Sequence, residues 1–121
     1  MIDSDYGYHW THKSLLPAIL ETHLDPEFAQ GKMKVVWWCE WSRVGYALGH
    51  IAARHGWMPD DMVLIRFDRS HVPYANTAYP GIYTTAARIK LRSRAAVKLH
   101  VLGEWITCRT LCRDIDRLRR I

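Results

Sequence analysis

The fold class of this chain is decided by the stretch Tyr8-His9-Trp10-Thr11. This short apolar run carries a histidine and a threonine, and it predicts a first strand over residues 7–11. An amphipathic helix is expected directly after it, because Ser14 is a suitable N-cap and Pro17 falls in the first helical turn.

The alternation of strand and helix continues along the chain. Residues 34–39 are β-branched and aromatic and predict a buried strand. Ser42 can cap a second helix that ends at Gly56. The apolar face of this helix would be formed by Val44, Leu48, Ile51, Ala52 and His55. A third strand is expected over residues 62–67. Together with the helix-borne Tyr46, this order suggests a pocket for a flat heteroaromatic ligand.

The second half of the chain predicts a loop and clustered strands. Residues 68–81 are polar and contain Pro73 and Pro80, so we expect a mobile or substrate-facing loop. Further strands are expected over residues 82–85, 97–102 and 104–107, and a closing helix over 110–120. The order β-α-β-α-β followed by clustered strands favours an α+β fold.

Composition limits the class of protein. The 121 residues predict a single domain, 1–121, with a core of its own. Six Trp and six Tyr against two Phe favour half-buried positions such as pocket walls and interfaces. The net charge of +5 favours anionic partners, either nucleic acid or a phosphate-bearing small molecule. Three cysteines argue against a disulfide framework, and no apolar run reaches transmembrane length, so we expect a cytoplasmic protein without a membrane partner.

Two parts of the sequence resemble ADP-ribosyltransferase-fold proteins. The first strand, followed by Leu15, Leu16, Ile19 and Leu20, is similar to the opening of small bacterial and phage members, among them DNA-modifying ADP-ribosyltransferase toxins and RNA 2′-phosphotransferases. The strand 62–67, the polar loop and Gly81-Ile82-Tyr83-Thr84-Thr85 resemble the phosphotransferase branch. The likeness spans most of residues 7–102. It implies an ADP-ribosyltransferase-like split mixed or antiparallel sheet with flanking helices, and NAD as the cofactor.

The resemblance also implies which residues hold the nicotinamide end of NAD. His9 would hydrogen-bond the ribose hydroxyls. The backbone of Trp10 and the hydroxyl of Thr11 would secure the carboxamide. Trp38 and Tyr46 would sandwich the ring.

The phosphate and the reacting bond need further groups. Ser42 and Arg43 stand at a predicted helix N-terminus, where exposed N–H groups favour anions. Breaking the nicotinamide–ribose bond builds positive charge on the ribose, which a carboxylate can stabilise. Glu104 has a suitable context, but if Gly81-Ile82-Tyr83 aligns with the Glu-bearing strand of the toxins, the catalytic position holds Tyr83 or Thr84 instead. The predicted catalytic set is His9, Tyr46, Tyr83 and Glu104.

The predicted function is transfer of ADP-ribose from NAD to a macromolecular acceptor, protein or nucleic acid, with release of nicotinamide. The alternatives are a non-enzymatic binding or inhibitor protein on the same fold, an RNA 2′-phosphotransferase-like protein and a nucleic-acid-binding module. Four arginines of the expected last helix form either a solvated face or a docking surface for RNA, DNA or an acidic protein: Arg109, Arg113, Arg117 and Arg120. Further cations nearby in sequence favour a nucleic-acid partner: Arg88, Lys90, Arg92, Arg94 and Lys98. No metal site is expected, because Cys108 and Cys112 lack the spacing of a zinc knuckle.

Overall fold

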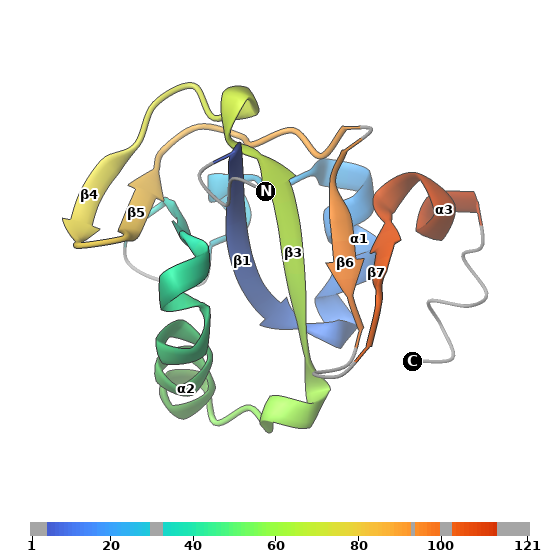
Figure 1. The fold of residues 1–121 in the computed structure, drawn as a ribbon, viewed down its shortest axis with the longest axis horizontal. Coiled ribbons are helices and arrows are strands. Elements are labelled where there is room, and N and C mark those ends of the chain that lie inside the picture. Colours follow the sequence, from blue (N-terminus) through green and yellow to red (C-terminus); the bar gives the residue numbers. More distant parts are fainter. Residues whose placement is uncertain (1–4, 30–32, 93, 100–102, 114–121) are drawn as a thin grey trace.

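Seven strands form one antiparallel sheet in the computed structural model, in the order β4-β5-β2-β1-β3-β6-β7 (Figure 1). The structure describes residues 5–29, 33–92, 94–99 and 103–113. The strands are β1 (Tyr6–His12), β2 (Val36–Cys39), β3 (Met62–Asp68), β4 (Asn76–Tyr79), β5 (Ile82–Thr85), β6 (Ala96–Lys98) and β7 (Trp105–Thr107). The helices are α1 (Leu16–Thr22), α2 (Val44–His55) and α3 (Cys108–Arg113). The fold is therefore α+β, with an antiparallel sheet and flanking helices.

The centre of the sheet is the pair β1 and β3. Their register runs without interruption from Tyr6 opposite Asp68 to His12 opposite Met62. Successive side chains of a strand point to opposite faces, so each strand contributes to two cores. We call these sides the α1 face and the α2 face, after the helix that packs on each.

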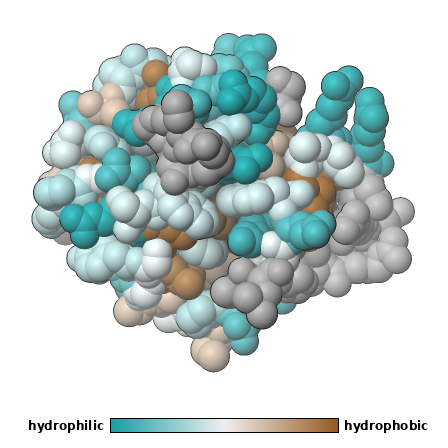
Figure 2. All heavy atoms as spheres, viewed as in Figure 1, coloured by the Kyte–Doolittle hydropathy of each residue, from teal (hydrophilic) through white to brown (hydrophobic). Residues whose placement is uncertain are grey.

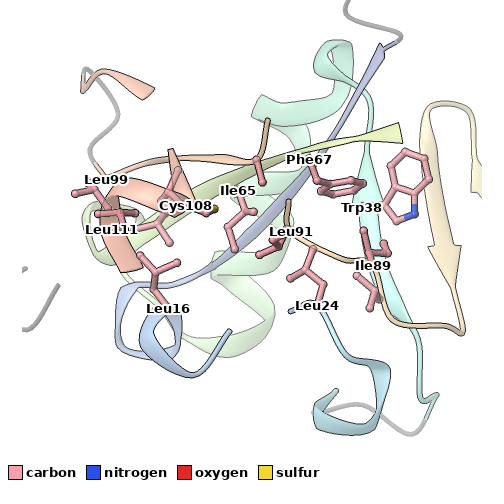
Figure 3. Packing of buried hydrophobic residues seen from close by; sticks show 14 residues of the cluster. Leu16, Leu24, Trp38, Ile65, Phe67, Ile89, Leu91, Leu99, Cys108 and Leu111 are labelled. Atoms are coloured by element: carbon pink, nitrogen blue, oxygen red, sulfur yellow. The ribbon is translucent and has the colours of Figure 1, made fainter. Parts of the chain in front are cut away.

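The α1 face holds the larger core (Figure 3). Ile65 and Phe67 of β3 pack there with Leu16 of α1. The connection between β5 and β6 crosses this face and contributes Ile89, which pairs with Leu24 through two backbone hydrogen bonds. In Figure 1, α1 lies behind the sheet.

The α2 face holds a second core of aromatic and aliphatic side chains. The side chains that α2 packs against the sheet are Val44, Ala47, Leu48, Ile51 and Ala52. They meet Tyr8 and Trp10 of β1 and Leu64 of β3. The predicted apolar face of this helix is confirmed except for His55, which is exposed and stacks on Trp57 with 4.3 Å between the ring centroids.

The sheet is almost divided between β1 and β2. These strands share one paired position, Tyr8 opposite Cys39, whereas β2 and β5 are paired over four positions. The strands β4, β5 and β2 thus form one part of the sheet, and β1, β3, β6 and β7 form the other. We call the junction between β1 and β2 the split.

Both helix starts differ from the prediction. Ser14 does not cap α1: its backbone N–H donates to the His12 ring at 3.1 Å, and a 3-10 turn over Lys13–Leu15 precedes the helix. Ser42 does not cap α2 either, because its hydroxyl donates to Glu40 at 3.0 Å and lies in a second 3-10 turn. Pro17 in the first turn of α1 and Gly56 at the end of α2, with a positive φ of 68°, are confirmed.

The second half of the chain is partly as expected. The predicted loop over residues 68–81 is wrong in part, because Asn76–Tyr79 pairs with β5 as an exposed edge strand. The last helix begins at Cys108, earlier than predicted. Residues 100–102 and 114–120 of the predicted strand and helix lie outside the described residues.

Across the described ranges, no helix is both long enough and apolar enough to cross a membrane. On the face seen in Figure 1, hydrophilic and near-neutral residues predominate, and hydrophobic residues appear as separate small areas (Figure 2).

Candidate functional site

His9 lies at the split. Its cross-strand partner Ile65 belongs to the core of the α1 face, so the half-buried His9 ring points to that side. The ring Nδ1 is 2.6 Å from the carbonyl oxygen of Trp37 in β2. A carbonyl oxygen only accepts hydrogen bonds, so Nδ1 carries a proton. Burial lowers the pKa of His9, and the hydrogen bond to the carbonyl opposes this to a smaller extent.

Two further contacts join the segment around His9 to the segment that follows β2. The indole N–H of Trp10 donates to the carbonyl oxygen of Val44 at 2.8 Å, where α2 begins. The ring of Tyr8 lies 5.2 Å from that of Trp41, between centroids. The sequence-predicted segments 8–11 and 37–46 are therefore brought together in space.

The turn between β4 and β5 contacts the segment that follows β2 at the split. The backbone N–H of Glu40 donates to the carbonyl oxygen of Gly81 at 3.0 Å, and Nε of Arg43 donates to that of Pro80 at 2.8 Å. The turn approaches so closely that a Cβ on Gly81 would lie 2.7 Å from Oε1 of Glu40. Gly81 also has a φ of 78°, which favours glycine.

The predicted ring sandwich between Trp38 and Tyr46 is not found among the described residues. Trp38 follows the alternation of β2 onto the α1 face, where it is buried, donates its indole N–H to Thr85 at 2.9 Å and stacks on Tyr83 at 4.6 Å. Tyr46 lies on the outward side of α2, is 61% exposed and stacks on His50 at 6.1 Å. The sheet lies between Trp38 and Tyr46, so they cannot clamp one ring in this structure.

The other predicted residues are spread over the fold. Thr11 is buried on the α1 face beside Val63. Glu104 is exposed directly before β7, and β3 and β6 lie between β7 and the strand that carries His9. Tyr83 is half-buried against Trp38. Glu104 and Tyr83 are therefore far apart in the sheet order, and Glu104 is distant from the split.

A stack of cations and rings on the α2 face was not predicted. The guanidinium of Arg66 lies 4.6 Å from the ring centroid of Tyr6 and 4.6 Å from that of Trp105. Arg94 and Lys98 flank these rings at 5.4 Å and 5.7 Å. Among the described residues, Nε of Arg66 is buried without a hydrogen-bond partner. An arginine inside the apolar run of β3 was the signal that could have indicated this stack.

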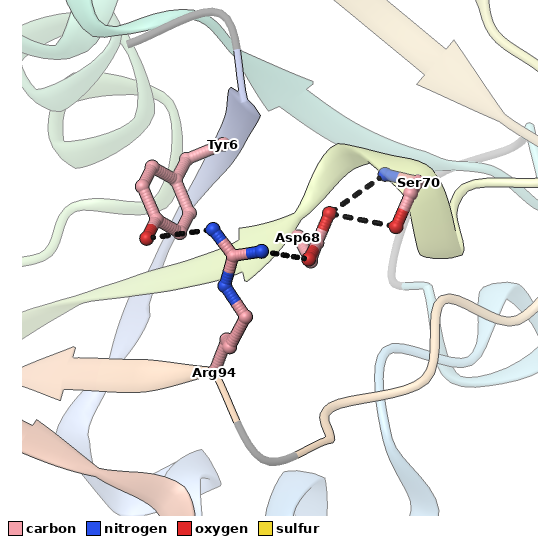
Figure 4. A network of polar contacts seen from close by, with 4 residues as sticks. All are labelled: Tyr6, Asp68, Ser70 and Arg94. Atoms are coloured by element: carbon pink, nitrogen blue, oxygen red, sulfur yellow. Dashed lines mark hydrogen bonds and ion pairs between the residues drawn. The ribbon is translucent and has the colours of Figure 1, made fainter. Parts of the chain in front are cut away.

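Arg94 also links this stack to a carboxylate (Figure 4). Its guanidinium donates to the Tyr6 hydroxyl at 3.2 Å and pairs with Asp68 at 3.2 Å. The other carboxylate oxygen of Asp68 accepts from the hydroxyl and the backbone N–H of Ser70, at 2.8 Å and 3.0 Å. The hydrogen bonds from Ser70 are the main cause that lowers the pKa of Asp68, with smaller contributions from Arg94 and His71.

Within the part of the chain that the structure describes, no group of three or more His, Cys, Asp and Glu side chains could hold a metal ion. Searches against protein-family models, curated proteins and solved structures find no match.

Proposed function

We propose that this chain is an ADP-ribosyltransferase-like protein that binds NAD at the split and transfers ADP-ribose to a macromolecular acceptor. The observation that carries the proposal is the meeting of segments 8–11, 37–46 and 80–83 at the split. The sequence resemblance assigns NAD to residues of the first two segments, and the third contains Tyr83 of the predicted catalytic set. The single pair between β1 and β2 supports the finer description of the fold as an ADP-ribosyltransferase-like split sheet.

The residues that take the nicotinamide ring differ in this proposal from those expected from the sequence. Trp38 is buried, whereas Trp37, Trp41 and Tyr46 are 36%, 43% and 61% exposed. All three belong to β2, the turn after it and α2. Of these three, Trp41 also contacts Tyr8 of β1, so a flat ring at the split would stack on the exposed face of Trp41. His9 then acts as a positioning residue, because its hydrogen bond fixes the carbonyl group of Trp37.

Glu40 supplies the carboxylate of the proposed site. It directly follows β2, accepts a hydrogen bond from Ser42 and contacts Gly81 at the turn into β5. Nicotinamide would leave with the electron pair of the glycosidic bond, and a carboxylate beside the ribose would stabilise the positive charge that remains. The acceptor would then add to the ribose carbon and lose a proton. Glu104 is too far along the sheet to take this role with residues of the split.

The proposal is tested by isothermal titration with NAD and by nicotinamide release in the presence of cell extract. We expect Glu40→Gln to lower nicotinamide release by about 100-fold, because a charged group near the reacting centre is lost, while NAD affinity is retained. Trp41→Ala should weaken NAD binding. Glu104→Gln and Tyr79→Ala are the matched controls, and both should behave as the unchanged protein.

Two results would overturn this assignment. The first is a lack of NAD binding at millimolar concentration by the unchanged protein. The second is a loss of nicotinamide release in Glu104→Gln with normal release in Glu40→Gln, which would return the catalytic role to the carboxylate beside β7.

A further inference from the structure

Residues 86–92 carry a row of cations across the outside of the α1 face. Ile89 and Leu91 point into the core, and Ile89 is held by its two backbone hydrogen bonds to Leu24. The residues that alternate with Ile89 and Leu91 point outward, and all three are exposed: Arg88, Lys90 and Arg92. We call these three residues the basic row. Alternate residues of an extended segment are about 6.6 Å apart, so the three charges form a regular line.

Among the described residues, the cations of the basic row form no ion pair. In the described part of the chain, ion pairs join Lys13 to Asp61 and Arg94 to Asp68, and none includes a residue of the basic row. Asp25 is placed near Arg88 by the pairing of Leu24 with Ile89, but its carboxylate accepts the backbone N–H of Glu27. Because Asp25 can offset at most one of the three cations, they and Asp25 together keep a net positive charge.

His23 lies beneath the basic row and responds to it. Its Nδ1 accepts the backbone N–H of Leu91 at 2.9 Å. Burial lowers the pKa of His23, and the charges of Arg88, Arg92 and Lys90 lower it further. All three cations are therefore close enough to His23 to act on its pKa.

A fourth cation extends the basic row toward α3. Arg92 and Arg109 both line a surface cavity of about 270 Å³. The other lining residues are Leu20, Leu91, Cys108 and Cys112. Arg109 is exposed on α3, so the line of positive charge continues from the extended segment onto the helix.

We propose that the basic row, together with Arg109, is a docking surface for the phosphodiester backbone of a single-stranded nucleic acid. Evenly spaced, exposed cations match a chain of regularly spaced anions, and their mutual repulsion is relieved when phosphates bind. The row is one extended segment on the outside of the fold. It can follow a single backbone, whereas the grooves of a duplex admit a helix or a two-stranded ribbon. The surface lies on the connection between β5 and β6, and the inference does not rest on the proposed NAD site.

The test is fluorescence anisotropy of a labelled 20-residue oligo(dT) at several salt concentrations, with no NAD present. We expect the triple variant Arg88→Gln/Lys90→Gln/Arg92→Gln to bind about tenfold or more weakly at low salt. The slope of log affinity against log salt should fall by about 2, because each lost contact to a single strand removes about 0.7. Arg54→Gln, which removes an exposed cation from α2, is the matched control and should bind as the unchanged protein does.

Circular dichroism of the triple variant shows whether the fold is intact, and a second readout does not depend on that variant. Bound phosphates offset the three cations, so the pKa of His23 should rise when oligo(dT) is added to the unchanged protein, as followed by NMR of the ring. Unchanged affinity in the folded triple variant, or a constant pKa of His23 under saturating oligo(dT), would overturn the proposal. Tighter binding of duplex DNA or of polyglutamate than of oligo(dT) would also overturn it.

Discussion

Nδ1 of His9 lies 2.6 Å from the carbonyl oxygen of Trp37, across the point where β1 and β2 separate. A side chain thus replaces a hydrogen bond of the backbone ladder at the split. On its other side, β1 is joined to β3 by seven paired positions. By contrast, β1 is joined to β2 by one paired position and the hydrogen bond of His9. This junction therefore depends on one ring, whose Nδ1–H can donate the bond in both the neutral and the protonated form.

His9 makes the stability of the fold depend on pH. Burial is the larger influence and lowers the pKa of His9 below its ordinary 6.5, so folding favours the neutral ring. The stabilisation is fully present above pH 6.5 and is lost as the pH falls through the lowered pKa. We expect the free energy of unfolding in urea to fall between pH 7.5 and pH 5, and to fall less in His9→Asn, whose amide can still donate to Trp37. An unchanged fall in His9→Asn would place the titration at His23 or His55, which also have lowered pKa values.

Gly7 is required by the packing of two rings beside it. A Cβ at this position would lie 2.5 Å from Phe67 and 2.8 Å from Trp38, and both rings are buried. Gly7→Ala should therefore lower the free energy of unfolding by about 1–3 kcal/mol, the usual cost of overpacking. Gly49→Ala is the matched control: nothing lies within 4 Å of its Cβ, and alanine should stabilise α2 by about 0.5–1 kcal/mol. Urea denaturation followed by circular dichroism measures both, and equal stability of the two variants would contradict the packing argument.

The carboxylate of Asp68 is stabilised more by Ser70 than by Arg94. The hydroxyl and backbone N–H of Ser70 are the first causes of its lowered pKa, and the paired Arg94 side chain is 56% exposed, so water screens its charge. We expect Ser70→Ala to raise the pKa of Asp68 more than Arg94→Gln does, as measured by NMR of the carboxyl carbon against pH. The stability that this carboxylate gives is present above its ordinary pKa of 3.8 and is lost as the pH falls through the lowered value. A larger rise in Arg94→Gln would make the ion pair the main cause.

The central strands were predictable because they are apolar runs rich in β-branched and aromatic residues, and α2 because its apolar residues have helical spacing. Residues 7–11, 34–39 and 62–67 contain β1, β2 and β3 almost completely, and the face of α2 followed from its spacing. Asn76–Tyr79 was not predictable, because an exposed edge strand carries no apolar pattern. The caps at Ser14 and Ser42 failed because 3-10 turns start both helices, and a serine in such a turn finds other partners.

The candidate site was predictable at the level of segments and less so at the level of side chains. The order of strand and helix brings 8–11 next to 37–46, as expected. The sheet face to which each side chain points depends on the register between strands. A shift of one residue moves every side chain of a strand to the opposite face. Trp38 and Tyr46 therefore ended on opposite faces although both segments meet at the split.

Trp37 and Trp38 are adjacent in β2, so substituting each in turn tests whether their side chains point to opposite faces of the sheet. Trp38 is buried, stacks on Tyr83 and donates its indole N–H to the hydroxyl of the fully buried Thr85, which itself donates to the carbonyl oxygen of Tyr74. Trp38→Phe keeps a ring but leaves Thr85 without this donor, so it should cost about 1–3 kcal/mol of unfolding free energy.

Trp37→Phe is the matched control, because this ring is 36% exposed and its change should cost less than about 0.5 kcal/mol. Urea denaturation of both variants at pH 7.5 gives the comparison. Equal losses would mean that the two rings share one environment, and the division of β2 between the α1 and α2 faces would then be incorrect.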